Sequence, residues 1–405
     1  MESHRPKKGI SVPEPSTGSG PESLLRSALP LRLKTHPKNR ETFTPGFLGV
    51  ERLLFFFGDL AMMTPTQSTQ TSAPVATACF DNVFDGDTRC PVGSIPNLKV
   101  VMQQPHPNVP KEHPEYVFQK DQLRDLLAFL YKPNNDALFI TGPTGCGKTS
   151  IVNEVCARLK WPVQEITCNA RMEFQTLKGQ FMLSSAAPGQ TPTMHFAYGP
   201  LATAMKEGHV LILNEIDLCD PGELAGLNDI LEGRPLVIAE NGGEVIEPHP
   251  NFRVIATANS AGSGDATGFY AGVQPQNIAA LDRYRWIRAS YMPVKVECEV
   301  VKLAVKQFAR AEMNDIVSGM VVLAGALRKM FEAGKLSVTM STRTLVRWAH
   351  IAEDFRNCPC ALRYGLERAL LFRLEPHEAA AIEEQASIIF GPAWQSAKAA
   401  PKKRN

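Results

Sequence analysis

The sequence has no long hydrophobic run and no excess of charge of one sign. The most apolar run, residues 53–57, is far shorter than the roughly 20 residues that a membrane-spanning helix needs. It also lies too far from the N-terminus for a secretory signal. Lys and Arg total 43 and Asp and Glu total 41, so the charge balance indicates neither a nucleic-acid surface nor a membrane surface.

The cysteines form no regular framework, and the chain contains no internal repeat. There are nine cysteines, and Cys358 and Cys360 are the only close pair. No second pair and no nearby histidines follow at the spacing of a metal site. An odd number of scattered cysteines is typical of free thiols in a reducing compartment, so we expect a cytoplasmic protein.

The two ends of the chain differ in composition from the middle. Residues 1–75 are rich in Pro, Ser, Thr, Gly and Lys and show little apolar periodicity, which predicts a disordered N-terminal segment. A second hypothesis is that the natural protein starts at Met62 or Met63, just before a polar stretch. Residues 393–405 are predicted to be a basic disordered tail.

Residues 76–292 alternate between strand-like and helix-like patterns. The strand-like apolar runs are 137–141, 162–167, 209–213, 252–257 and 286–291. The helix-like stretches between them are 150–159, 201–207 and 223–231. Strands that alternate with helices predict an α/β domain with a parallel sheet covered on both faces.

After Pro293 the strand-like patterns stop. Amphipathic helical patterns follow at 300–310, 315–333, 342–355, 361–372 and 378–389. Residues 293–392 are therefore predicted to form an all-α lid domain behind the α/β core.

A phosphate-binding motif lies between the first strand and the first helix. Residues 142–149 match G-x-x-x-x-G-K-[ST] in full. Glycines let the backbone N–H groups face a phosphate, and the N-terminus of the following helix favours negative charge. We expect Lys148 to reach the β- and γ-phosphates of ATP and Thr149 to ligate Mg²⁺. The predicted nucleotide-binding residues are Gly142, Pro143, Thr144, Gly145, Cys146, Gly147, Lys148, Thr149 and Ser150.

A polar pair ends the strand at 209–213. Asn214 and Glu215 stand where a P-loop ATPase usually has Asp and Glu. Glu215 is predicted to orient or deprotonate the attacking water, and Asn214 to contact Mg²⁺ more weakly than a carboxylate would. Asn214→Asp is accordingly expected to lower the Mg²⁺ requirement. Asp217 is close in sequence but need not face the metal, and an ordinary buried strand that ends in a turn is the alternative.

Asn259 is a polar amide residue that follows the strand-like run 252–257, as Asn214 follows the run 209–213. An Asn in this position is often only a turn residue. After the two preceding motifs, a contact with the γ-phosphate or the lytic water is the favoured interpretation.

These motifs resemble the MoxR-type AAA+ ATPases, and within them most closely the group of the cobaltochelatase ATPase subunit CobS. The likeness covers about residues 80–390. It rests on segments 142–149, 214–217, 256–259, 262–270 and 280–283, together with 248–253. The sequence of the phosphate loop, residues 142–149, also resembles that of the CbbQ and NorQ activases.

The resemblance implies a ring, with a hexamer as the expected form and ATP at the subunit interfaces. Asn259 would be the sensor 1 residue, and Arg283 falls where the family has its arginine finger, with Arg285 and Arg288 as alternatives. Arg343 falls at the family's sensor 2 position. Each arginine would stabilise charge on the transferring phosphoryl group. Segments 181–198 and 260–278 correspond to two insertions that face the pore and remodel a client.

The function expected from this resemblance is an ATP-hydrolysing remodelling motor. It would act with a von Willebrand factor A partner, of the CobT type, on a metal chelatase or another metalloprotein. One alternative is a nucleotide-gated scaffold with weak hydrolysis, which Asn214 suggests. A nucleic-acid-dependent motor is the other, although the sequence has no basic stripe and no aromatic platform for bases.

Overall fold

The computed structural model describes residues 75–78, 80–91, 98–101, 106–184, 191–264, 268 and 270–394. The predicted segment 1–75, including the hypothesis on Met62 and Met63, lies outside these residues except for its last position. The same holds for the tail 393–405 beyond residue 394. Within the described ranges, no helix has both the length and the apolar character needed to cross a membrane.

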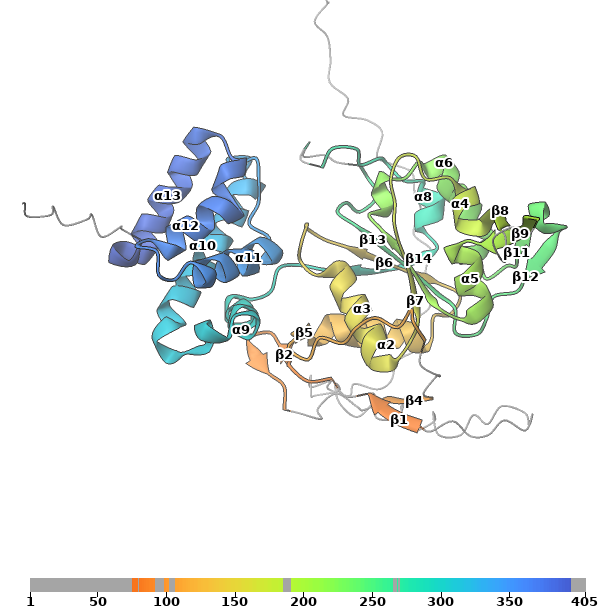
Figure 1. Cartoon of the computed structure of the whole chain (residues 1–405), viewed down its shortest axis with the longest axis horizontal. Coiled ribbons are helices and arrows are strands. Elements are labelled where there is room, and N and C mark those ends of the chain that lie inside the picture. The colour runs from red at the N-terminus through yellow and green to blue at the C-terminus, as the bar shows by residue number, and fades with distance from the viewer. Residues whose placement is uncertain are drawn as a thin grey trace, which may run out of the picture. The chain divides into compact units, whose positions relative to one another are not determined.

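Five parallel strands form the central sheet, as predicted. They are β6 (Ala137–Thr141), β7 (Val163–Thr167), β10 (Val210–Asn214), β13 (Arg253–Ala258) and β14 (Tyr284–Arg288). Their order across the sheet is β14-β6-β13-β10-β7, and every pair is parallel (Figure 1). The carboxyl ends of all five strands therefore meet at one edge, where loops can combine into a site.

Four main helices cover the sheet on both faces. On one face lie α2 (Lys120–Tyr131) and α3 (Lys148–Leu159), and on the other α4 (Phe174–Lys178) and α5 (Pro200–Glu207). Successive side chains of a strand point to opposite faces. Leu138 and Ile140 accordingly pack with α2 and α3, whereas Ala137 and Phe139 pack with α4 and α5.

Several elements differ from the predicted bounds. The predicted helix 223–231 is broken into α6 (Pro221–Leu224), the 3-10 turn η3 (Ala225–Leu227) and α7 (Asn228–Leu231). A Cβ on Gly226 would lie 2.7 Å from the Phe174 ring, so this interrupted segment packs closely against α4. The predicted strand 286–291 is β14 at 284–288 instead, because its partner β6 ends at Thr141, opposite Arg288.

Smaller elements surround the core. The predicted insertion 181–198 overlaps an antiparallel hairpin of β8 (Gly179–Ser184) and β9 (Thr193–Tyr198), whose first strand starts two residues earlier. The remaining short strands are β1 (Val75–Ala78), β2 (Val83–Asp85), β3 (Thr88–Arg89), β4 (Leu98–Val101), β5 (Phe118–Gln119), β11 (Leu236–Ile238) and β12 (Glu244–Ile246). Insertion 260–278 contains a Ser263–Pro275 bridge and ends at α8 (Ile278–Leu281).

The C-terminal part is helical, as predicted. Its helices are α9 (Val294–Ala304), α10 (Asn314–Glu332), α11 (Thr342–Asp354), α12 (Ala361–Ala369) and α13 (Pro376–Phe390). The bounds predicted for its first helix, 300–310, were wrong, because α9 spans Val294–Ala304. The helix starts directly after Pro293, and its Glu297 is buried in an ion pair with Arg328, so the polar first turn belongs to the helix.

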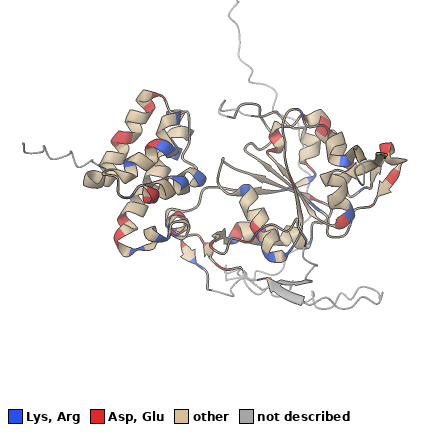
Figure 2. Cartoon of the chain, in the orientation of Figure 1, with Lys and Arg blue, Asp and Glu red and all other residues tan. Residues whose placement is uncertain are grey.

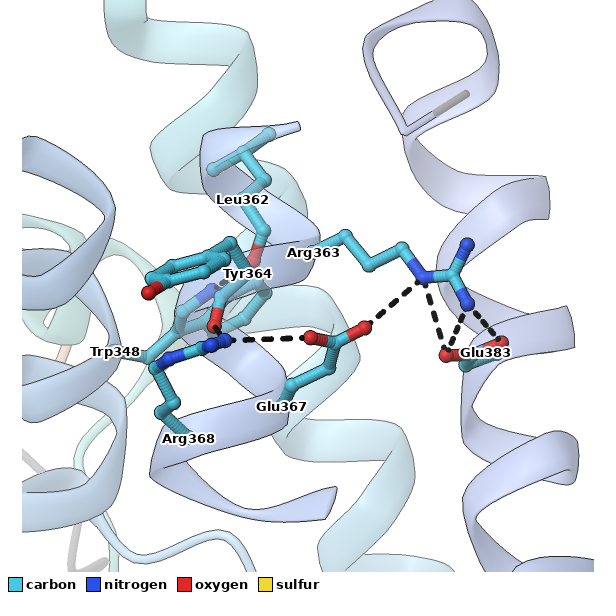
Figure 3. Close-up of polar contacts among 7 residues, drawn as sticks. All are labelled: Trp348, Leu362, Arg363, Tyr364, Glu367, Arg368 and Glu383. Atoms are coloured by element: carbon cyan, nitrogen blue, oxygen red, sulfur yellow. Dashed lines mark hydrogen bonds and ion pairs between the residues drawn. The ribbon is translucent and has the colours of Figure 1, made fainter. Parts of the chain in front are cut away.

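These helices share one hydrophobic core around Trp348, which is fully buried. The Trp348 indole Nε1 donates a hydrogen bond to the Leu362 carbonyl oxygen at 2.7 Å, which joins α11 to α12 (Figure 3). Arg363 on α12 contacts Glu383 on α13 at 2.9 Å and Glu367 on its own helix at 3.4 Å. The helical part thus has its own hydrophobic core and its own hydrogen bonds and ion pairs between helices.

Candidate nucleotide site

The phosphate loop occupies the carboxyl end of β6, and close packing requires two of its glycines. A Cβ on Gly142 would lie 2.2 Å from the Ala289 carbonyl oxygen. Gly145 has a φ of +67°, and its Cβ would lie 2.6 Å from Cβ of Ser341. Since an L side chain is unfavourable at such a φ, the loop backbone is held in a shape that only glycine adopts without strain.

Lys148 is buried inside this loop and is surrounded by oxygen atoms. Its Nζ donates to the carbonyl oxygens of Gly142 at 2.8 Å and Pro143 at 3.0 Å, and to Oδ1 of Asn259 at 2.9 Å. Burial lowers the pKa of Lys148, and the carboxylates of Asp217 and Glu215 oppose this shift. A phosphate oxygen is the same kind of acceptor, so this cage fits the predicted phosphate contact.

The two predicted metal-ligating residues contact each other. The Thr149 hydroxyl donates to Oδ1 of Asn214 at 2.6 Å, and the Thr257 hydroxyl donates to the same oxygen at 3.1 Å. The Asn214 amide nitrogen points the other way and donates to Oε1 of Glu165 at 2.7 Å. A hydroxyl and an amide oxygen are ligands that Mg²⁺ accepts, so the donor set fits this ion.

Glu215 leaves the strand in an uncommon backbone conformation. Its φ is +54°, a left-handed value that costs a residue with a side chain on the order of 1 kcal/mol or more. Its backbone N–H donates to the Thr257 hydroxyl at 3.4 Å. The side chain is exposed, and its carboxylate has no hydrogen bond or ion pair with any residue in the described part of the chain. The turn therefore presents a free carboxylate at the edge that carries the phosphate loop.

Asp217 is a positioning residue that the sequence left unassigned. It is fully buried, and its Oδ2 accepts hydrogen bonds from the backbone N–H groups of Asn259 at 3.1 Å and Ser260 at 3.0 Å. The Ser260 hydroxyl donates to the same oxygen at 3.0 Å. Asp217 thus fixes the end of β13 and, with it, the Asn259 side chain that contacts Lys148. Its carboxylate faces this end of β13 and not Thr149.

A cavity of about 390 Å³ adjoins the phosphate loop. This volume falls within the range of small-molecule sites. Its walls combine loop residues, the first turn of α11 and an apolar group from dispersed segments. The apolar group is Val117, Met292, Val300, Ala304 and Val346, with Tyr116 beside it. No sequence motif signalled these residues, because they come from four separate segments.

Arg343 lies at this cavity, in the first turn of α11. Ser341 caps the helix by accepting a hydrogen bond from the Thr344 N–H at 3.1 Å, and the Thr342 hydroxyl donates to Glu297 at 2.6 Å. These contacts hold the start of the helix against the loop, where Arg343 is close enough to oppose the charge of Lys148. The structure therefore brings the predicted sensor 2 residue to the phosphate loop.

Arg283 lies elsewhere. It precedes β14, at the end of the sheet opposite to the phosphate loop, since Ala137 pairs with Tyr284 and Thr141 with Arg288. Its guanidinium forms an ion pair with Glu232 and donates to the Ala279 carbonyl oxygen. Arg285 is paired with Asp136 at 2.9 Å at the same end. Neither arginine lies beside the phosphate loop of its own chain.

A contact chain connects the phosphate loop to the helical part. The Tyr291 hydroxyl donates to the Thr144 carbonyl oxygen at 2.8 Å, and the Arg328 guanidinium carbon lies 3.9 Å from the centre of the Tyr291 ring. Burial raises the pKa of Tyr291 to about 12, so the hydroxyl stays a donor. Burial also raises the pKa of the Cys146 thiol, which therefore stays protonated and unreactive near neutral pH.

This fold and this site define the chain as a P-loop protein of the AAA+ class. Residues 137–270 match the family "AAA domain (dynein-related subfamily)", and residues 308–389 match "CbbQ/NirQ/NorQ C-terminal". The aerobic cobaltochelatase subunit CobS of Sinorhizobium sp is 31% identical over 271 residues, which cover 65% of this chain and 80% of that protein. The chain therefore belongs to the MoxR-type AAA+ ATPases and is similar to CobS.

One further relative and one solved structure also match, each with a weaker likeness than CobS. An uncharacterized protein of Staphylococcus haemolyticus is 29% identical over 203 residues, covering 50% of this chain and 72% of that protein. The solved structure of the RuvB Holliday junction branch migration motor of Thermotoga maritima matches with a TM-score of 0.36 and 13% identity. It covers 68% of this chain and 72% of that one, and the likeness is too low to bear on function.

Proposed function

We propose that this protein binds ATP with Mg²⁺ and hydrolyses it. One observation supports this above all: two consecutive side chains at the start of α3 reach the ends of two neighbouring strands. Lys148 contacts Asn259 after β13, and Thr149 contacts Asn214 at the end of β10. The Lys148 ammonium, the Thr149 hydroxyl and the two Asn side chains thus converge at one edge of the sheet.

Each side chain then has a defined role in the proposal. Mg²⁺, when bound, neutralises charge on the phosphate oxygens. Lys148 binds phosphate, and Asn259 exchanges its Lys148 contact for the γ-phosphate or the lytic water. Glu215, free and exposed, orients or deprotonates that water. Arg343 acts within its own chain, whereas Arg283 would act on the nucleotide of a neighbouring copy.

We further propose that the active form is a ring, with six copies as the expected number, that remodels a protein client. The β8–β9 hairpin supports a protein-contacting role, because Leu183 and Met194 are about 70% exposed and lie in paired positions. CobS is named as a subunit of a cobaltochelatase. By analogy, the client is a metal chelatase or another metalloprotein, and the partner is a von Willebrand factor A protein.

The charge distribution gives no support to a nucleic-acid motor. Figure 2 shows Lys and Arg mixed with Asp and Glu along the helices and strands that the structure describes. A protein that grips a phosphate backbone usually carries a continuous basic surface.

Lys148→Ala tests the nucleotide site. Loss of the buried ammonium is expected to abolish most fluorescent mant-ATP binding and phosphate release, while thermal unfolding still shows a cooperative transition. Lys160→Ala is a matched control, because Lys160 follows α3 and pairs with exposed Glu112 at 3.4 Å. Wild-type binding and turnover in Lys148→Ala would refute the proposed site.

Assembly is tested separately. Glu215→Gln is expected to retain ATP, and light scattering coupled to size-exclusion chromatography should then show a closed ring of about six copies with ATP and Mg²⁺. A chain that stays monomeric with bound ATP at all concentrations would contradict the ring.

A nucleotide-gated scaffold is the second candidate, because Asn214 carries no charge where a carboxylate is usual. The scaffold hypothesis predicts tight ATP binding with almost no phosphate release at saturating Mg²⁺. Steady-state phosphate release by the wild type distinguishes it from the motor.

A further inference from the structure

We propose that Glu165 supplies the carboxylate that Asn214 lacks, so that the two residues together replace a single Asp at the Mg²⁺ side of the site. Glu165 would be a positioning residue, acting on the metal through the Asn214 amide. This inference rests on the proposed Mg·ATP site. It concerns a residue on β7, a strand to which no motif drew attention.

The contacts of Glu165 connect it to the start of α3 in two ways. Its Oε1 accepts from the Asn214 amide nitrogen at 2.7 Å, and its Oε2 accepts from the Asn153 amide nitrogen at 2.9 Å. Asn153 lies one turn after Thr149 on α3, and Thr149 donates to Asn214. The hydrogen bonds therefore run from α3 through β10 and β7 and return to α3.

The first effect of Glu165 is on the orientation of the amide. An ionised carboxylate accepts hydrogen bonds and cannot donate them, so it fixes the NH₂ end of Asn214 toward itself. The amide oxygen is then the atom that faces Thr149, and this is the atom that can serve a cation. Without Glu165, the amide could turn over and present N–H donors to the metal.

The second effect is on charge. An Asn–Glu pair carries one negative charge, as a single Asp does, but places it one hydrogen bond further from the metal. Groups that hydrogen-bond a metal ligand in this way tune metal affinity. Glu165 is exposed, and its carboxylate binds two amides rather than a cation, so the arrangement has no evident role in packing.

This geometry changes what is expected of Asn214→Asp. The new carboxylate would stand at hydrogen-bond distance from Glu165, and two like charges at that distance repel. The single substitution should therefore fail to strengthen Mg²⁺ binding, in contrast to the expectation from sequence. The double variant Glu165→Gln with Asn214→Asp moves the negative charge from position 165 to position 214. It should bind Mg²⁺ about as well as the wild type, because the Gln amide can donate a hydrogen bond to the new Asp.

Four proteins form the test: the wild type, Glu165→Gln, Asn214→Asp and the double variant. The readout is the free Mg²⁺ concentration that gives half-maximal mant-ATP fluorescence, with metal-free mant-ATP binding in EDTA measured beside it. Glu165→Gln is expected to raise that Mg²⁺ concentration about 10-fold or more, as hydrogen-bonding partners of metal ligands do. Asn214→Asp should not lower it, and the double variant should return close to the wild type. Metal-free binding should stay the same in all four.

Glu112→Gln is the control, since Glu112 is another exposed carboxylate whose side chain contacts Lys160, at the end of α3 opposite to Lys148 and Thr149. It should behave as the wild type. A Mg²⁺ requirement unchanged by Glu165→Gln, or a double variant no better than Glu165→Gln alone, would overturn the role of Glu165. Failure of the proposed function is distinct, because the wild type would then not bind mant-ATP at any Mg²⁺ concentration.

Discussion

Replacing Arg283 with alanine separates a structural role of this side chain from a role in hydrolysis across a subunit interface. In the single chain, the guanidinium is paired with Glu232, and the exposed fractions of the two side chains are 26% and 34%. Ion pairs with this much solvent contact contribute little to stability. If the role is only structural, Arg283→Ala should lower the Tm slightly and leave ATP hydrolysis intact.

A role as an arginine finger predicts a much larger effect of a different kind. Such fingers contribute about 10³ to 10⁵ in rate, which corresponds to about 4 to 7 kcal/mol of barrier. Because Arg283 lies at the sheet end away from its own phosphate loop, ATP binding should be nearly normal. Phosphate release under saturating Mg·ATP measures the rate, and mant-ATP fluorescence measures the binding.

Arg285→Ala is the matched comparison, and it also tests Arg285 as the alternative finger, for which a loss of hydrolysis in Arg285→Ala alone would speak. Arg285 lies at the same end of the sheet and pairs with Asp136 at 2.9 Å, so its loss removes a comparable ion pair. It should keep most of the hydrolysis rate. Equal losses in Arg283→Ala and Arg285→Ala would show that the effect comes from the sheet end as a whole and not from one guanidinium.

Mixed rings test the interface directly. Arg283→Ala retains its own Glu215, and Glu215→Gln retains its own Arg283, so a hybrid interface can hold one intact site. Phosphate release should recover partly on mixing, in proportion to the hybrid interfaces. No recovery in rings shown to be mixed, for example by two affinity tags, would refute the assignment of Arg283 to the neighbouring site.

Two predictions concern stability. Burial lowers the pKa of His209 in the folded chain below its ordinary 6.5. Between the folded and the unfolded pKa, the unfolded chain therefore binds more protons than the folded chain. The free energy of unfolding then falls as the pH falls, by at most about 1.4 kcal/mol per pH unit. Urea unfolding from pH 7 to pH 5 should show this slope, and His209→Gln should flatten it; an equal slope in both would exclude His209 as its source. Trp348→Ala should cost about 3–5 kcal/mol, because the side chain is fully buried. Phe372→Ala, 71% exposed, should cost little in the same urea titration, and equal costs would contradict the packing argument.

Much of the architecture was predictable because the relevant signals are local. The phosphate loop is one contiguous segment between an apolar strand and a helix, and its glycines have conformations that few other residues adopt. The alternation of strands and helices was equally visible, since buried parallel strands are short apolar runs. Element ends were less predictable. The end of β14 depends on where β6 stops, and α9 includes a polar first turn because Glu297 pairs with distant Arg328.

The sequence by itself determined the class of site: a phosphate loop, a strand ending in Asn214 and Glu215, and a second strand ending in Asn259. Only the tertiary structure decided what surrounds them. It placed Glu165 behind Asn214, Asp217 behind Asn259, and a cavity with apolar walls beside the loop. The physical reason is that each of these contacts joins segments far apart in the chain, so no spacing along the sequence encodes it. Their assembly follows from the order of the strands in the sheet and from the packing of the first turn of α11 against the phosphate loop.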